Sequence, residues 1–143
     1  MKKQIYFEEI EADDEIPELI KEPSTRQLVM WAGASGDLNP IHYDKDYAVS
    51  RGLPGVVVHG QLAGCFLAQM VTDWIGERGS LKKININYKS MNLPGKRLVC
   101  KGKVTGKSDE DGEGMVTASL WVENAEGEKT LTGTAKVALP IKN

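Results

Sequence analysis

The feature that most limits the fold is a helix-forming segment, Gln61 to Ile75, that is apolar on nearly every side. Its apolar side chains recur with helical spacing and cover almost the whole circumference: Leu62, Ala63, Cys65, Phe66, Leu67, Ala68, Met70, Val71, Trp74 and Ile75. A helix that is apolar nearly all round is usually buried on every side. The rest of the chain is therefore expected to wrap around this helix, which Gly76 ends.

After Gly79 the spacing of apolar residues changes from the helical period to the period of two that is typical of strands. Residues 84–88 alternate between apolar and polar, and three further alternating stretches span residues 98–104, 116–122 and 131–137. Short turns separate the four stretches. Consecutive strands joined in this way predict an antiparallel meander.

The part of the chain before the central helix predicts shorter elements. Residues 1–23 contain eight carboxylates and are expected to form a short strand and an acidic loop. Ser24 and Gln27 have the spacing of a capping box, which predicts a short helix from Arg26 to Ala34. Gly36 can end that helix.

These elements predict an α+β fold in which an antiparallel sheet curls around one long helix. A length of 143 residues fits a single domain spanning residues 1–143. One helix cannot cover both faces and the open edges of a sheet. We therefore expect a second copy of the chain to pair with it as a homodimer.

Charge and composition exclude several classes of protein. The 18 basic and 20 acidic residues leave a net charge of −2, whereas a dedicated nucleic-acid binder would be strongly basic. No segment reaches the roughly 18 apolar residues that cross a bilayer, and no apolar stretch follows the N-terminus, so we expect a cytoplasmic protein without a secretory signal. Cys65 and Cys100 lack metal-ligand spacing and are expected to be reduced, buried thiols.

Candidate chemistry lies in the segment from Gly36 to His42. Pro40 cannot continue a helix and holds Asn39 in an extended conformation. The turn thereby fixes Asp37 and His42 beyond the end of the first helix. Such a pair can position a water molecule and move protons near neutral pH, as general acid–base catalysis requires. The alternative is an Asx-type turn beside an incidental surface histidine.

A second candidate is Gly60, which follows the apolar run from Val56 to His59. A glycine lets the backbone approach a ligand, and the N–H groups in the first turn of a helix lack partners within it. Such a donor, aided by the helix dipole, can stabilise an oxyanion on a thioester carbonyl. Helix capping explains the same glycine, and His59 is expected to be a structural hydrogen-bonding residue at the helix entry.

The two segments together resemble the MaoC-like, or hydratase 2, family of (R)-specific enoyl thioester hydratases and dehydratases. The resemblance rests on the motif from Gly36 to His42, on Ala48, and on His59-Gly60 after a loop of the family's length. It is closest to the short, mycobacterial-type 3-hydroxyacyl-carrier-protein dehydratase subunits, whose motifs look like Ser35 to His42 and Trp74 to Gly76 of this chain.

The resemblance implies a hot-dog fold and a catalytic pair, Asp37 and His42. The pair would add water across the 2,3 bond of an acyl-CoA or acyl-carrier-protein thioester, or remove it. Gly60 would donate to the oxyanion, and Asn39 and Pro40 would support the turn. Neither a metal nor another cofactor is implied, and neither nucleic acid nor a membrane is an expected partner. A heterodimer with a related subunit is the alternative to the homodimer.

Other residues are weaker candidates. Tyr43 and Tyr47 could line the acyl channel or simply cover the core. Gln69, on the central helix, is expected to be a hydrogen-bonded core amide. Some members of the family have a serine where Ala68 stands, so any polar contact from that position is lost here.

Two other functions stay open. A hot-dog acyl thioesterase usually places its catalytic carboxylate on or beside the central helix, where this chain has only Asp73, near the C-terminal end. A non-catalytic acyl-binding partner subunit is the second alternative. The presence of both Asp37 and His42 argues against it.

Basic residues are concentrated in one stretch of the chain. Nine of the 18 lie between Arg78 and Lys107, a stretch with no Asp or Glu, whereas the N-terminal segment is acidic. Some of these side chains could hold the phosphates of coenzyme A or the acidic surface of a carrier protein. They could equally face water and discourage association between sheet edges.

Overall fold

The computed structural model describes residues 3–142, so residues 1, 2 and 143 of the expected domain lie outside the described part. In chain order the elements are η1 (Phe7–Glu9), β1 (Glu15–Lys21), α1 (Thr25–Ser35), η2 (Pro40–His42), α2 (Lys45–Ser50), α3 (Gly60–Ile75), β2 (Ser80–Tyr88), β3 (Leu98–Glu110), β4 (Glu113–Glu123) and β5 (Lys129–Leu139). None of the helices in this part of the chain is long and apolar enough to cross a membrane.

The five strands form one antiparallel sheet in the order β1-β3-β4-β5-β2. β3, β4 and β5 form the predicted meander. The prediction that β2 opens this meander is wrong, because β2 pairs with β5, with Tyr88 opposite Leu131 and Ser80 opposite Ala138. Alternating residues define the two faces of a strand but not its neighbours. The link over residues 89–97 is long enough to carry the chain from β2 to β3 without a hairpin.

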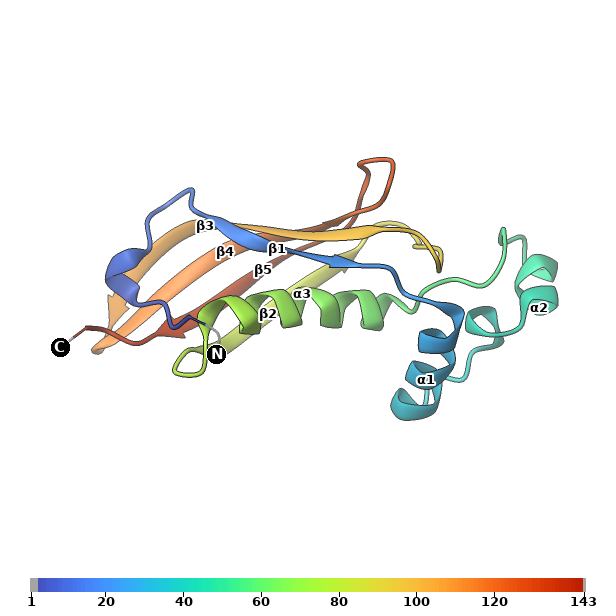
Figure 1. The fold of residues 1–143 in the computed structure, drawn as a ribbon, viewed down its shortest axis with the longest axis horizontal. Coiled ribbons are helices and arrows are strands. Elements are labelled where there is room, and N and C mark those ends of the chain that lie inside the picture. Colours follow the sequence, from blue (N-terminus) through green and yellow to red (C-terminus); the bar gives the residue numbers. More distant parts are fainter. Residues whose placement is uncertain (1–2, 143) are drawn as a thin grey trace.

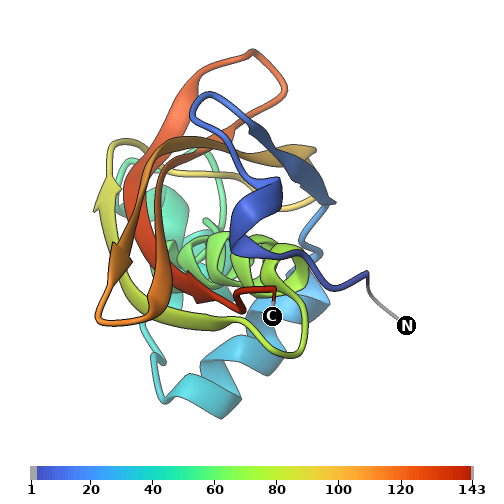
Figure 2. The same cartoon turned by 90° about the vertical axis from the view of Figure 1, so that its left-hand side faces the viewer.

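The sheet curls around α3, which runs along its concave side (Figures 1 and 2). Leu67 and Val71 of α3 belong to one continuous core together with sheet residues such as Leu98, Leu120 and Val137. This arrangement confirms the predicted α+β hot-dog fold. Helices α1 and α2 lie at the end of the molecule where α3 begins (Figure 1).

The prediction that α3 is buried on every side is wrong. Gln61, Cys65 and Gln69 recur every four residues and are exposed, so Cys65 is not a buried thiol and Gln69 is not a core amide. The cause is that a single curled sheet encloses only part of a helix's circumference, and small apolar residues extend the pattern while burying little area. Cys100 is buried as predicted, and burial raises the pKa of its thiol to about 12.

The local signals around α1 are confirmed. Ser24 caps the helix, and its Oγ accepts a hydrogen bond from the backbone N–H of Gln27 at 3.2 Å. Gly36 ends it in the left-handed region, with φ of 78°. Helix α2 was not among the expected elements. Asp44 caps it by accepting from the N–H of Tyr47 at 3.0 Å, a cap that the Gly-, Pro- and Asn-rich surroundings conceal.

Candidate functional site

The turn after α1 is built from side chains that bind the backbone two residues further along. Asp37 Oδ1 accepts from the N–H of Asn39 at 3.4 Å, and Asn39 Oδ1 accepts from the N–H of Ile41 at 3.3 Å. Pro40 then begins η2, where its fixed φ suits the first position of a helix. These consecutive Asx turns give the segment one shape and direct the side chain of His42, the last residue of η2, into the molecule.

One hydrogen bond determines the orientation and the tautomer of His42. The side chain is buried, and its Nδ1 lies 2.7 Å from the carbonyl oxygen of Val57. Because a carbonyl can only accept, Nδ1 carries the proton, and in the neutral ring Nε2 keeps its lone pair. Nε2 lies 3.7 Å from Oδ2 of Asp37, whose side chain is 41% exposed. The two acceptor atoms therefore face each other where water can reach them.

His59 lies directly against His42. The two rings are stacked, with 3.7 Å between their centroids and 19° between their planes. His59 is 1% exposed, and its Nε2–H donates to the backbone carbonyl of Asp37 at 3.4 Å. Burial and the neighbouring His42 lower the pKa of His59, so its ring is held in the neutral form. Its Nδ1 has no hydrogen-bond partner among residues 3–142.

Asp37, His42 and His59 also form the cluster of potential metal ligands that the sequence spacing did not reveal. Their donor atoms all lie within 4.8 Å of one another. The rings of the two histidines are stacked nearly parallel, however, so their in-plane lone pairs do not converge on one ion. Two of the four ring nitrogens also face backbone carbonyls. This geometry fits a metal centre poorly.

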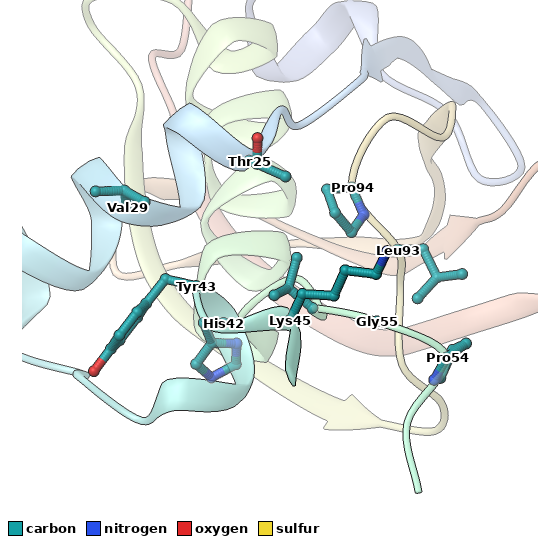
Figure 3. A pocket seen from close by; sticks show the side chains of 10 residues that line it. Thr25, Val29, His42, Tyr43, Lys45, Pro54, Gly55, Leu93 and Pro94 are labelled. Carbon is teal, nitrogen blue, oxygen red and sulfur yellow. The ribbon is translucent and has the colours of Figure 1, made fainter. Parts of the chain in front are cut away.

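A cavity of about 350 Å³ reaches His42 from the side of α1 (Figure 3). Thr25 and Val29 of α1 line it, together with Tyr43 and with loop residues that include Pro54 and Leu93. The lining is largely apolar. Tyr43 thus lines the same cavity as His42, and its hydroxyl donates to the carbonyl of Leu38 at 2.9 Å.

Gly60 lines a separate cavity of about 270 Å³ at the start of α3. It directly follows His59, which places its backbone next to the stacked rings. A Cβ atom at Gly60 would lie 3.0 Å from the ring of Tyr88, so the absence of a side chain is what allows that close approach. Asn92 lines the same cavity, and its backbone carbonyl accepts from the N–H of Val58.

Tyr47 lies apart from these residues. It does not line the His42 cavity, and its hydroxyl accepts a hydrogen bond from Arg51 at 3.0 Å. The sequence reasoning also missed two contacts: the Val57 carbonyl that orients His42, and the ring of His59 stacked on it. Only the proximity of Val57 and His59 to the Gly60 signal hinted at either contact.

Comparisons with known proteins agree on one family. Residues 8–126 match the model of the MaoC like domain. The fatty acid synthase beta subunit TOXC of Cochliobolus carbonum is 30% identical over 118 residues, which cover 80% of this chain. The match spans only 5% of that protein's length.

Shorter relatives match over most of their own length. The (R)-specific enoyl-CoA hydratase of Aeromonas caviae is 23% identical over 123 residues, covering 85% of this chain and 90% of that protein. Among solved structures, the ChsH1-ChsH2 complex from Mycobacterium tuberculosis contains a chain with the same fold. Its TM-score is 0.80 at 24% identity, with 90% of this chain and 97% of that chain covered.

Proposed function

The chain belongs to the MaoC-like domain family, and from that premise we propose that it is an (R)-specific enoyl thioester hydratase or 3-hydroxyacyl thioester dehydratase, a hydro-lyase. The observation that carries the proposal is the hydrogen bond from His42 Nδ1–H to the Val57 carbonyl, because it leaves Nε2 free beside Asp37. The relative from Aeromonas caviae, an (R)-specific enoyl-CoA hydratase, supports the same reaction.

In this proposal Asp37 and His42 act together on one water molecule. The water donates one hydrogen bond to His42 Nε2 and the other to the Asp37 carboxylate. Nε2 takes a proton from the water as its oxygen bonds to C3, and the nearby carboxylate stabilises the imidazolium that forms. The pair then delivers a proton to C2, so that a hydroxyl group and a hydrogen are added in total. Dehydration is the reverse.

Gly60 is proposed as the donor to the thioester oxygen. As water adds to C3, the electrons of the double bond move toward the carbonyl, and negative charge develops on its oxygen. The N–H of Gly60 lies in the first turn of α3, where backbone donors lack partners within the helix and the helix dipole favours negative charge. A preorganised donor of this kind stabilises the transition state more than the substrate.

His59 is proposed as a positioning residue. Its ring stacks on His42, and its Nε2–H holds the backbone of Asp37, so it touches both members of the pair. A neutral ring suits this role, because a charged His59 would oppose the imidazolium that forms on His42. The other supporting residues are Asn39 and Pro40, which fix the turn.

The remaining assignments follow the same reasoning. We propose that residues 1–143 form one MaoC-like hot-dog domain that works as a homodimer in the cytoplasm. A heterodimer with a related subunit is the alternative, and the similar chain in the ChsH1-ChsH2 complex also occurs in a complex. The substrate is an acyl-CoA or acyl-carrier-protein thioester. The chemistry described above needs no metal or organic cofactor.

The thioesterase alternative is disfavoured by the position of Asp73. It lies 13 residues after Gly60 on the same helix, which corresponds to about 20 Å along the axis. Incubation with an enoyl-CoA separates the alternatives, and we expect loss of the conjugated double bond without release of free thiol, unchanged by a chelator. Thiol release would indicate a thioesterase, and no reaction would indicate a binding subunit.

A further inference from the structure

The structure divides the basic residues of the chain into two groups. Along β3, lysines pair with acidic side chains of the N-terminal segment and of β4. Lys101 lies 3.1 Å from Glu123, and Lys107 lies 3.5 Å from Glu11. On the edge strand β2, Lys82 lies 3.6 Å from Glu113 of β4. Each of these three lysines therefore has a local acidic partner.

A second, larger group, which also includes Lys83 and Lys89, has no such partner among residues 3–142. Lys45, Lys96 and Arg97 take part in no ion pair among residues 3–142. Lys45 lines the His42 cavity, and in Figure 3 its side chain extends toward Leu93 and Pro94. Free positive charge is therefore present at the cavity that reaches the proposed catalytic pair.

Lys96 lines a second cavity, which adjoins the His42 cavity. Lys96 lines a cavity of about 170 Å³, and both Pro54 and Leu93 line this cavity and the His42 cavity. Arg97 follows Lys96 directly and is exposed. Lys45 and Lys96 thus line two adjoining cavities, and Glu126 lines the second cavity together with Lys96.

The loop that carries Lys96 and Arg97 is held in place at two points. The N–H of Gly95 donates to the carbonyl of Pro23 at 2.8 Å, just before α1. The carbonyl of Asn92 accepts from the N–H of Val58 at 2.8 Å, one residue after the carbonyl that orients His42. Backbone hydrogen bonds therefore set the position of the loop with Lys96 and Arg97 relative to the proposed reaction centre.

We propose that Lys45, Lys96 and Arg97 bind a phosphate group on the pantetheine arm of the thioester substrate. The inference rests on the proposed function, which supplies a thioester whose carrier is anionic. A phosphate supplies the negative charge that these unpaired cations lack, and its oxygens accept charge-assisted hydrogen bonds from them. Arg97 can bind two phosphate oxygens at once, and the lysines act as mobile point charges.

The same phosphate chemistry has two sources, coenzyme A and the phosphopantetheine of an acyl carrier protein. The test uses three crotonyl thioesters: of pantetheine, which has no phosphate, of phosphopantetheine, which has one, and of coenzyme A. The variant is Lys96→Glu/Arg97→Glu. The matched control is Lys82→Glu/Lys83→Glu, which makes the same change of charge at neighbouring residues on β2.

The expected result is that the KM for the coenzyme A thioester, relative to that for the pantetheine thioester, rises about tenfold in Lys96→Glu/Arg97→Glu, as the loss of a hydrogen bond to a charged group predicts. The control should leave this ratio unchanged. A full effect with phosphopantetheine assigns the site to the phosphate common to both carriers. An effect limited to coenzyme A would place the contact at the nucleotide phosphates and contradict the proposal.

The proposal would be overturned if Lys96→Glu/Arg97→Glu raised the KM equally for the three thioesters. It would also be overturned if both double variants changed the KM ratio equally. A wild-type protein that turns over no thioester would instead refute the proposed function. In that case calorimetric binding of free coenzyme A still tests the phosphate site, since Lys96→Glu/Arg97→Glu should weaken it about tenfold and the control should not. Equal affinity of all three proteins would refute the site.

Discussion

At the scale of single residues, the hydrogen bond between His42 and Val57 gives the site its chemical direction. It commits Nδ1 to the backbone and leaves Nε2 beside Asp37, where we propose that it exchanges protons with water. The proposed acid–base pair, Asp37 and His42, is visible in the sequence within the motif from Gly36 to His42. The Val57 carbonyl is not, because the contact joins residues 15 positions apart, and no local pattern encodes such a pairing.

Removal of either member of the pair should abolish most turnover. General acid–base groups contribute about 10² to 10⁴-fold each, so Asp37→Asn and His42→Ala should each lower kcat by that order. Because both residues act on one water molecule, the double variant should lose much less than the product of the single effects. Steady-state kinetics on variants with native circular dichroism tests this. Normal turnover in either single variant would contradict the assignment.

His59 should make the stability of the protein depend on pH. Its folded-state pKa lies below the unfolded value, because burial and His42 disfavour its charged form. Below a pH of about 6.5 the unfolded chain therefore binds a proton that the folded chain does not. As the pH is lowered through this range, the free energy of unfolding decreases by at most about 1.4 kcal/mol per pH unit. The ionisable groups facing the ring are His42 and Asp37.

The variant His59→Phe keeps a flat ring against His42 but cannot bind a proton. Denaturant unfolding between pH 5 and 7.5 should show a shallower loss of stability in His59→Phe than in the wild type. The other titrating groups are the same in both proteins, so the difference in slope reports on residue 59. Parallel slopes would show that His59 is not held neutral by the fold.

At the scale of elements, signals carried by neighbouring residues predicted the structure, and those that depend on distant contacts did not. The Ser24 cap and the stop at Gly36 are local, and both are confirmed. The place of β2 beside β5 is decided by how the whole sheet closes around α3, which alternation cannot report. The wrong prediction for the exposed face of α3 has the same cause. Apolar residues show that a helix face can be buried, but not that another element of the chain covers it.

Two glycines should respond to alanine in opposite ways. In β5, a Cβ at Gly133 would overlap the carbonyl oxygen of Asn85 in β2, so Gly133→Ala should cost about 1–3 kcal/mol by forcing the two strands apart. Gly33 is exposed on α1 with nothing within 4 Å of its Cβ position, so Gly33→Ala should stabilise the protein by about 0.5–1 kcal/mol. Denaturant midpoints measure both, and equal effects would contradict the β2–β5 packing.

At the scale of the whole molecule, the uncovered surfaces lie close together. β2 is an edge strand, and Tyr88 near its end is 55% exposed while its ring lies against Gly60 and Gly64 of α3. The exposed row of Gln61, Cys65 and Gln69 lies on the same helix. An edge and an incompletely covered helix are surfaces that a second copy can bury.

We therefore expect light scattering to give the molar mass of a dimer for the wild type. The Cys65→Arg substitution should shift that mass toward the mass of a monomer. An arginine at an exposed helix position is tolerated by the folded chain but not in a packed interface. The matched control is Thr134→Arg, on the exposed face of β5, which should leave the dimer intact. A wild-type monomer, or two variants that behave alike, would rule out this interface.

The central claim concerns where water is added, and the most direct test is to follow its oxygen. Crotonyl thioester is incubated with the wild-type protein in water enriched in ¹⁸O, and the product is analysed by mass spectrometry and chiral chromatography. We predict an intact 3-hydroxyacyl thioester of (R) configuration, with the label in its C3 hydroxyl group. Label in a free carboxylate, with the double bond retained, would mean that water attacks the thioester carbonyl and would contradict the account.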